Sequence, residues 1–516
     1  MEKHWIRVVF RRRVLIIAFI LAQLAFIIFA IASTHFAFRY MEFILKTFSI
    51  IVCIYILNKT ENSAYKLTWI FLILLFPLFG GPVYAFFHTQ SRPRKLRRQV
   101  VKANRQYRPL FQPANGALAE LAAGHRECLP LAHYLQQYAG FPVYKHTQTI
   151  YFDSGESFFK QVLEELQKAE KYIFLEFFIL RQGEMLDPIL DILAEKAARG
   201  LDVRIIYDDL GCFMSLPANF DKTLESRGIK CMIFNPFKPI LSSLQNNRDH
   251  RKIVSIDGKV AFTGGINLAD EYINAQERFG HWKDSAIMLQ GEASWSLTLI
   301  FLHMWNLDKK AQDNAALFYP WKDAAGIPSP CPVESDGYAQ PYADSPIDTE
   351  NVGEHVYIQI INNAKEYVYI NTPYLVVDDK LLSALTLAAK SGVDVRIITP
   401  YRWDKWIVSV VSRSYYRQLI QEGVKVYEYS AGFNHSKTFV SDDRVATVGT
   451  TNLDFRSLYL HFECGVCVYK TKSVAKVKED FLVTLPLCKA ITLKDCSRNA
   501  AQRIIQDVLR IFAPLM

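Results

Sequence analysis

Apolar and polar positions divide the chain into a strongly apolar front and a longer, regularly alternating remainder. The front holds three apolar segments, at about residues 14–32, 40–58 and 67–87. A helix needs about 20 apolar residues to cross a membrane, so the outer two have the required length, whereas the middle one is apolar mainly from Phe43 to Leu57, which is shorter, and includes Lys46. The third contains Pro77, Gly80, Gly81 and Pro82, which favour a broken or re-entrant segment.

Beyond residue 145, short apolar strands alternate with amphipathic helices, and the alternation occurs twice. KYIFLEFFIL at 171–180 resembles EYVYINTPYL at 366–375, and GLDVRIIYDD at 200–209 resembles GVDVRIITPY at 392–401. GIKCMIF at 228–234 likewise resembles GVKVYEY at 423–429. Each half therefore predicts strand, helix, strand, helix, strand. The fold class is α/β, with two pseudo-symmetric lobes, each a sheet flanked by helices.

These patterns predict five parts of the chain. Residues 1–90 form a membrane region with two to three transmembrane segments, and residues 91–145 form a basic juxtamembrane and connecting segment. The first lobe covers 146–320 and the second covers 350–516. Between them, residues 321–349 are rich in Pro, Gly, Ser and Asp and are predicted to be a linker.

One polar pattern occurs in both lobes: His, one residue, Lys, four residues, Asp, six residues, Gly, two residues, Asn. Its residues are His250, Lys252, Asp257, Gly264 and Asn267 in the first copy and His435, Lys437, Asp442, Gly449 and Asn452 in the second. A single copy would be weak evidence of a site. Two copies with the same offsets indicate a duplicated site.

Local geometry explains why this spacing suits a site. KIVSIDGKVAF predicts a hairpin around Asp257 and Gly258, and KTFVSDDRVATV predicts a second one. The motif His and Lys share one face of a strand because they are two residues apart. Two such pairs, brought together by pseudo-symmetry, suit a phosphate diester. The lysines and Asn amides would hold its oxygens, one His would attack phosphorus and the other would protonate the leaving oxygen.

Other interpretations of these residues stay open at this point. Asp257 starts a turn, so a purely structural role is the alternative to a chemical one, while the motif glycines permit close backbone approach. A metal site is disfavoured because Lys occupies the place of a further ligand. Cys464 and Cys467 form a lone pair in an apolar strand, which favours buried thiols.

Two further carboxylates follow the motifs. Asp284 lies 34 residues after His250, and Glu463 lies 28 residues after His435. A catalytic histidine usually needs a carboxylate that fixes its tautomer. We predict that these two residues orient the histidines, with ordinary ion pairs as the alternative.

The two motifs resemble the paired HKD motifs of the phospholipase D superfamily, and the chain is similar more narrowly to its bacterial cardiolipin synthases. The narrower resemblance rests on RDHRKIVSIDGKVAFTGGINLADEYI, FGHWKDSAIMLQGEASWSLTLIFLHMW, TTNLDFRSLYLHFECGV and FPLFGGPVYAFF. It implies a site between the lobes, no metal or cofactor, and a phosphohistidine intermediate, with His250 as nucleophile and His435 as general acid. It also implies condensation of two phosphatidylglycerols into cardiolipin and glycerol, and a multi-pass location in the bacterial cytoplasmic membrane. The apolar front departs from the family's usual two spans.

The distribution of charged residues along the chain helps to identify the class of substrate. Residues 1–100 contain 14 Lys or Arg against 3 Asp or Glu, so the remaining residues contain 46 against 48. A nuclease needs a basic surface over its catalytic region, whereas basic residues beside membrane segments attract anionic lipids. We therefore expect phosphatidylglycerol and other anionic lipids as partners and no nucleic acid. A hydrolase with the same chemistry and a non-catalytic scaffold are the alternatives, although two intact motifs argue against the scaffold.

Overall fold

The computed structural model describes residue 25 and residues 36–88, 91–111, 116–237, 243–307, 313–322, 329, 331–348 and 350–515. The chain forms two compact units. The smaller contains residues 1–95, 237–246 and 510–516, and the larger contains residues 96–236 and 247–509. The predicted apolar segment at 14–32, apart from residue 25, lies outside the described residues.

Three apolar helices make up most of the described part of the smaller unit: α2 (Phe36–Leu57), α3 (Ser63–Leu75) and α4 (Gly80–His88). Asn62 caps α3 by accepting the backbone N–H of Ala64 at 2.9 Å. Two glycines allow α4 to pack tightly, because a Cβ at Gly80 would lie 2.6 Å from the Cα of Ile73. A Cβ at Gly81 would lie 2.7 Å from the hydroxyl of Ser49. Small residues permit the same close approach between membrane helices.

The structure changes which apolar segment is long enough to cross a membrane. Residues Arg39–Leu57 are long and apolar enough to cross a membrane by length and composition, and among the described residues only this helix meets both criteria. Within 67–87 the chain leaves one helix at Phe76 and Pro77 and enters another at Gly80, while the two to three spans expected for this region stay a prediction. Proline lacks the N–H that a continuous helix requires, so the predicted break is confirmed.

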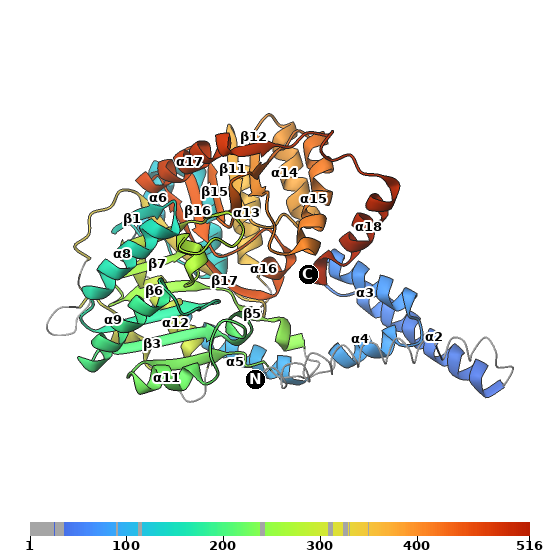
Figure 1. Ribbon diagram of the computed structural model, residues 1–516, viewed down its shortest axis with the longest axis horizontal. Helices are drawn as coiled ribbons and strands as arrows, with labels where there is room; N and C mark the ends of the chain where they lie inside the picture. The colour runs from blue at the N-terminus through green and yellow to red at the C-terminus, as the bar shows by residue number, and fades with distance from the viewer. Residues whose placement is uncertain are drawn as a thin grey trace. The chain divides into compact units, whose positions relative to one another are not determined.

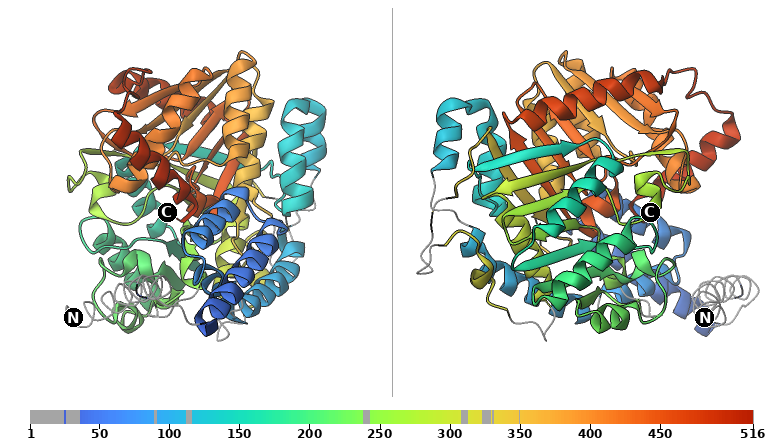
Figure 2. Two further views of the ribbon diagram at one scale, coloured as in Figure 1. Left: turned by 90° about the vertical axis from the view of Figure 1, so that its right-hand side faces the viewer. Right: turned by 60° about the vertical axis from the view of Figure 1, so that its left-hand side comes forward.

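The first lobe of the larger unit is built on a seven-stranded sheet (Figures 1 and 2). Its strands, in spatial order, are β1 (Thr147–Phe152), β9 (Ala286–Gly291), β7 (Val260–Gly264), β6 (Lys252–Ile256), β2 (Tyr172–Phe177), β3 (Asp202–Asp208) and β4 (Lys230–Phe234). The predicted strands and the β6–β7 hairpin are confirmed.

The second lobe repeats this order. Its strands are β10 (Tyr338–Asp344), β17 (His461–Tyr469), β16 (Val445–Gly449), β15 (Thr438–Ser441), β11 (Tyr367–Asn371), β12 (Asp394–Pro400) and β13 (Lys425–Tyr429), followed by β18 (Cys488–Ala490). The first seven correspond one by one to those of the first lobe. The duplication inferred from the repeated sequence patterns is therefore present in the topology.

Strand β10 corrects the predicted linker at 321–349. Residues Tyr338–Asp344 pair in antiparallel register with β17, from Tyr338 opposite Tyr469 to Asp344 opposite Glu463. They are the counterpart of β1 rather than part of a connection. Pro341 made this stretch resemble a loop, but β10 is the edge strand of its sheet, where proline is tolerated.

Helices cover the sheets and join the two lobes. The first lobe carries α8 (Gly155–Gln167), α9 (Leu186–Ala198), α10 (Asp209–Cys212), α11 (Phe220–Ser226) and α12 (Ser294–Trp305). The second carries α13 (Val352–Asn363), α14 (Asp379–Lys390), α15 (Trp406–Gln421), α16 (Phe455–Tyr459) and α17 (Lys472–Thr484). Side chains of α12 and α17 belong to one hydrophobic core together with residues of both sheets. The lobes therefore share a core.

The predicted connecting segment at 91–145 is largely helical. It contains α5 (Ser91–Tyr107), α6 (Ala117–Gly124) and α7 (Leu129–Tyr134). Tyr107 donates a hydrogen bond to the carbonyl of Leu302 in α12, and Gln340 of β10 donates to the carbonyl of Ala132 in α7, both at 3.1 Å. These contacts attach the end of α5 and α7 to the two lobes.

The motif aspartates occupy equivalent turns. Asp257 and Asp442 both have φ of 53°, a left-handed conformation that Asp tolerates better than most residues. Asp257 accepts the backbone N–H groups of residues 170–172, each at 2.8 Å, just before β2. Asp442 accepts those of residues 365–367 at 2.7, 2.9 and 2.9 Å, just before β11. Each carboxylate thus fixes the start of a central strand.

This geometry predicts that Asp257→Ala acts mainly on stability. It removes three charge-assisted hydrogen bonds, and leaving buried donors unsatisfied costs about 1–3 kcal/mol. We expect the free energy of unfolding to fall by about that amount in denaturant titrations, while the folded fraction keeps most of its turnover. Asp191→Ala, at an exposed carboxylate paired with Arg227, is the control and should change stability little. Unchanged stability with lost turnover would contradict a structural role.

Candidate active site

The two lobes exchange short strands at the motif histidines. Strand β5 (Arg248–Asp249) of the first lobe pairs in parallel with the start of β17 in the second. Strand β14 (Gly432–Asn434) of the second lobe pairs in parallel with β8 (His281–Lys283) of the first. Each motif histidine is the residue that follows the exchanged strand. The site is therefore composed of both lobes.

The exchange gives each histidine a carboxylate from the opposite lobe. The backbone N–H of His250 donates to the carbonyl of Phe462 at 2.9 Å, and the next residue, Glu463, places its carboxylate 2.8 and 3.0 Å from Nδ1 of His250. The N–H of His435 donates to the carbonyl of Lys283 at 2.7 Å, and the next residue, Asp284, lies 2.7 Å from Nδ1 of His435. If each Nδ1 carries the proton, each Nε2 has a free lone pair.

Each motif lysine donates from Nζ to the carbonyl of its own histidine. Both side chains are buried, which disfavours the ammonium form. Burial lowers the pKa of Lys252 to about 8 and that of Lys437 to about 7. The site therefore holds two cationic groups that a bound anion would stabilise.

Burial also keeps both histidines neutral, but to different degrees. It lowers the pKa of His435 to about 4, with Lys437 acting in the same direction and Asp284 opposing both. It lowers the pKa of His250 well below the usual range, with Lys252 and His461 adding to the effect. Burial raises the pKa of Glu463, against the influence of Lys252. The two halves of the site are thus electrostatically unequal.

The motif glycines allow the carboxylate-bearing strands to approach closely. A Cβ at Gly264 would lie 2.4 Å from the carbonyl oxygen of Ser285, and one at Gly449 would lie 2.6 Å from that of Cys464. The next positions differ, because Gly265 leaves room for Asp284 whereas Thr450 donates its hydroxyl to Glu463. Glu463 therefore accepts a hydrogen bond from Thr450 that has no counterpart at Asp284.

The motif asparagines are not equivalent. Asn267 accepts the N–H of Ile179 at 3.0 Å and donates to the hydroxyl of Tyr272 at 2.7 Å, so most of its amide serves the fold. The buried Oδ1 of Asn452 has no hydrogen-bond partner among the described residues. Asn452 is therefore the one of the two with an amide oxygen available to accept a hydrogen bond from a bound molecule.

Sequence reasoning missed Arg251, which connects the lobes beneath the site. Its guanidinium donates to the carbonyls of Glu463 and Asp344, both at 3.2 Å, and lies 3.7 Å from the carboxylate of Glu176. Glu176 and Asp249 are also fully buried. These residues could have been found from the sequence because they are charged positions within apolar strands. Charged groups are rarely buried without partners.

His461 was also missed. Its ring centroid lies 5.5 Å from that of His250, and neither ring nitrogen has a hydrogen-bond partner among the described residues. His250, His461 and Glu463 offer ligand atoms within 4.8 Å of one another, which by geometry alone could hold a cation. Lys252 opposes such a cation, because its charge acts on all three groups. His461 can therefore form new hydrogen bonds with whatever enters the site.

Comparison with known proteins agrees with this geometry. The family described as "Cardiolipin synthase, PLD-like domain" matches residues 162–294 and 357–484, and "Phospholipase_D-nuclease N-terminal" matches residues 47–87. A "Cardiolipin synthase" from Geobacillus sp. (strain WCH70) is 36% identical over 468 residues, covering 89% of this chain and 90% of that protein. Another, from Alkalihalophilus pseudofirmus, is 34% identical over 473 residues, covering 90% and 92%.

An uncharacterised protein from Streptococcus mutans serotype c is 42% identical over 464 residues, covering 90% of this chain and 99% of that protein. Among solved structures, a phosphatidylserine synthase from Haemophilus influenzae has a TM-score of 0.56 at 16% identity, covering 75% of this chain and 98% of its own, which supports the two-lobed fold. The fold and site are those of a phospholipase D-like phosphotransferase. Within that class, the chain belongs to the cardiolipin synthase family.

The lowered lysine pKa values predict how anion binding depends on pH. Above pH 7 to 8 the empty site loses ammonium protons, so binding a phosphodiester requires proton uptake and weakens by up to about tenfold per pH unit. Dimethyl phosphate is a suitable inhibitor because its own charge stays constant over this range. We expect its inhibition constant to rise between pH 7 and pH 9. Lys437→Arg keeps a permanent charge and should remove the pH dependence near pH 7, where Lys437 titrates. A flat profile for the wild-type protein would contradict the lowered lysine pKa values.

Proposed function

We propose that this protein condenses two molecules of phosphatidylglycerol into cardiolipin and glycerol through a phosphohistidine intermediate. The single observation that carries the proposal is the pair of histidines, each bound at Nδ1 by a carboxylate of the opposite lobe. Membership of the cardiolipin synthase family supports the choice of substrate.

In the first step, Nε2 of His250 attacks the phosphorus of one phosphatidylglycerol. A nitrogen–phosphorus bond forms, the bond to the headgroup glycerol oxygen breaks, and His435 gives that oxygen a proton. The negative charge of the bound diester raises the proton affinity of His435 above that of the empty site, where its pKa is about 4. Glycerol leaves as a neutral alcohol.

In the second step, neutral His435 removes a proton from a glycerol hydroxyl of a second phosphatidylglycerol. The resulting oxygen attacks phosphorus, the nitrogen–phosphorus bond breaks, and His250 is regenerated. Lys252, Lys437 and the side-chain NH2 of Asn452 donate to the non-bridging oxygens, where charge develops in the transition state. His461, beside His250, donates or accepts a hydrogen bond to the glycerol headgroup.

The assignment of roles is supported by the electrostatic inequality of the two halves. His435 keeps the higher proton affinity because Asp284 opposes the effect of burial, which suits a general acid. His250 faces Lys252, His461 and Lys437, all of which disfavour its cation. A histidine that stays neutral has its lone pair ready to attack phosphorus.

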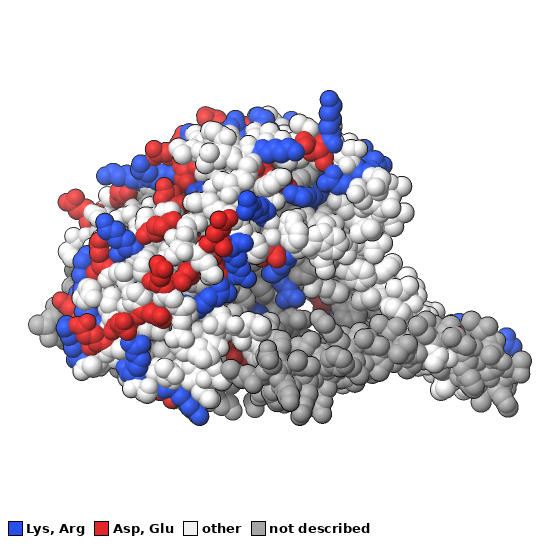
Figure 3. Space-filling model, in the orientation of Figure 1, with Lys and Arg blue, Asp and Glu red and all other residues white. Residues whose placement is uncertain are grey.

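The membrane location is part of the proposal. Helix α2 can cross a bilayer, and the apolar sequence at 14–32 would supply a second span. Lys and Arg are interspersed with Asp and Glu over the face of the molecule in Figure 3. That mixture supports a lipid substrate, because a nucleic-acid backbone requires a basic surface.

The direct test is lipid product analysis with labelled phosphatidylglycerol and purified protein in nanodiscs. We expect cardiolipin and glycerol in equal amounts, with activity surviving chelation because the lysines stabilise the transition-state charge. Phosphatidic acid as the main product would identify a hydrolase instead. Lys252→Ala and Lys437→Ala should each lower turnover by about 10²–10³-fold, and the double variant should be little worse because both lysines act on one site. Multiplying losses would contradict a single shared site.

A second experiment separates the histidine roles. An aryl leaving group needs little protonation, so His435→Ala should recover much of the first step with an aryl phosphatidyl substrate and accumulate a phosphohistidine in rapid-quench samples. His250→Ala should show neither, because no leaving group replaces a missing nucleophile. Rescue of His250→Ala instead would reverse the roles. Failure of both variants would argue against a covalent intermediate on these residues.

A further inference from the structure

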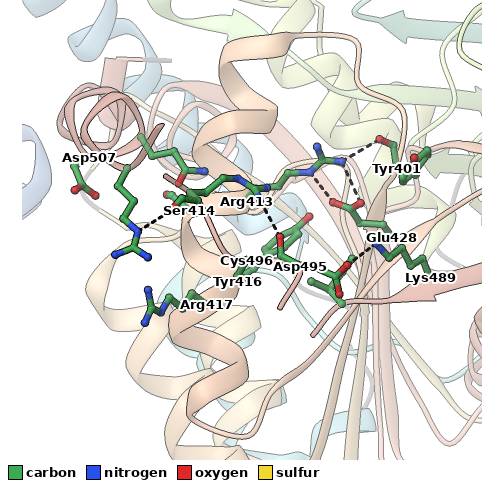
Figure 4. Close-up of a pocket in the computed structure, with 14 residues that line it drawn as sticks. Tyr401, Arg413, Ser414, Tyr416, Arg417, Glu428, Lys489, Asp495, Cys496 and Asp507 are labelled. Atoms are coloured by element: carbon green, nitrogen blue, oxygen red, sulfur yellow. Dashed lines mark hydrogen bonds and ion pairs between the residues drawn. The ribbon is translucent and has the colours of Figure 1, made fainter. Parts of the chain in front are cut away.

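A polar pocket of about 410 Å³ lies in the second lobe, outside the catalytic site. It is bounded by α15, by β13 and β18, and by α18 (Ala500–Ile511) with the loop that precedes it (Figure 4). None of the motif histidines or lysines lines it. Among its described residues, the first lobe has no counterpart of β18 and α18, so the pocket is not part of the duplicated site.

The lining of this pocket is more basic than acidic. It contains five basic side chains (Arg413, Arg417, Lys489, Arg498 and Arg503) and three acidic ones (Glu428, Asp495 and Asp507). Arg413 forms two hydrogen bonds with Glu428, at 2.7 and 3.1 Å, and Lys489 lies 2.6 Å from Asp495. These two pairs neutralise four of the eight charges, as Figure 4 shows.

The remaining three arginines have no carboxylate within ion-pair distance among the described residues. Arg498 donates to the carbonyls of Asp495 and Ser497, both at 2.9 Å, and Arg503 donates from Nε to the carbonyl of Arg498 at 3.1 Å. Carbonyl acceptors do not neutralise the guanidinium groups of Arg498 and Arg503, and with Asp507 counted the lining keeps an excess of two positive charges. Several donors remain on each group, and guanidinium is well suited to bind phosphate oxygens.

Helix α18 also carries an exposed apolar face. Ile504, Ile505 and Val508 are 64%, 50% and 44% exposed. The helix ends at Ile511, whose carbonyl accepts a hydrogen bond from Thr68 of α3 at 2.7 Å, and Phe512 packs edge-on against Phe71 of α3. Helix α18 supplies Arg503 and Asp507 to the pocket. A few residues further along the chain, Ile511 and Phe512 pack on the apolar helix α3. A helix that carries basic residues and an exposed apolar face is suited to the membrane interface.

We propose that this pocket is a second, non-catalytic lipid site that binds the phosphate of an anionic phospholipid. Arg417, Arg498 and Arg503 hold the phosphate oxygens, while the apolar face of α18 contacts the acyl chains. A lipid is favoured over a soluble phosphate because the basic pocket and the exposed apolar side chains are carried by the same helix. This inference goes beyond the proposed function, since it assigns a lipid to residues that take no part in phosphoryl transfer.

The test measures which lipids contact α18 in the full-length protein. A photoreactive benzoylphenylalanine replaces Val508 in a Lys437→Ala background, which blocks turnover so that binding is read independently of catalysis. The protein is placed in nanodiscs of phosphatidylcholine with a minor share of phosphatidylglycerol, and crosslinked lipids are identified by mass spectrometry. We expect phosphatidylglycerol to be enriched at least threefold over its share of the bilayer.

Arg417→Ala with Arg503→Ala should return the crosslinked lipids to the bulk ratio, whereas Arg417→Lys with Arg503→Lys should keep part of the enrichment. The matched control is Arg199→Ala with Arg227→Ala, which removes one exposed and one partly buried arginine of the first lobe and should leave the enrichment unchanged. Bulk ratios in the parent protein, or no lipid crosslinks at all, would overturn the proposal. So would calorimetric binding of glycerol phosphate in neutral nanodiscs without lipid enrichment, which would identify a soluble phosphate site.

Discussion

The parallel exchange of β5 with β17 and of β14 with β8 is the constraint on which the active site depends. In each exchange, a histidine N–H binds the carbonyl of one residue, and the next residue on that strand supplies the carboxylate to the same imidazole. Parallel register thus sets ring position and tautomer together. Neither lobe can build a complete histidine–carboxylate pair alone, because His250 depends on Glu463 and His435 depends on Asp284.

Burying two lysines and two histidines in one volume is electrostatically unfavourable, and the rest of the fold offsets that cost. The shared core around α12 and α17 holds the lobes together, and Arg251 binds backbone carbonyls of Glu463 and Asp344 in the second lobe. The lysine ammonium groups donate hydrogen bonds to the backbone carbonyls of the motif histidines. An anionic phosphate relieves the repulsion between these groups, so the energy of burial favours binding of the diester, where charge is concentrated in the transition state.

Much of this arrangement was predictable from sequence, because repeated spacing and strand periodicity are local signals. The two lobes, the Asp257–Gly258 turn and the helix break near Pro77 follow from such signals. The pairing of Asp284 with His435, and of Glu463 with His250, did not, because it is set by strand exchange between lobes. Strand β10 was hidden by Pro341, which only its edge position makes tolerable. His461 gave no local signal, since its importance comes from the unoccupied hydrogen-bonding capacity of a buried ring.

The comparison of the two lobes is most informative at the positions where they differ. Gly265 and Thr450 are equivalent positions, yet of the two Thr450 alone donates to its carboxylate. Among the described residues, the ring of His250 lies beside a further histidine, His461, whereas the ring of His435 lies beside Tyr272, Trp282 and Phe433. Asn267 is bound within the fold while Asn452 retains a free amide oxygen. A symmetric site would attack phosphorus equally well from either side. Of these differences, His461 acts directly on proton affinity, because it adds to the lowering of the pKa of His250, whereas Asp284 opposes the lowering at His435. The two histidines are therefore not interchangeable, which suits them to different roles.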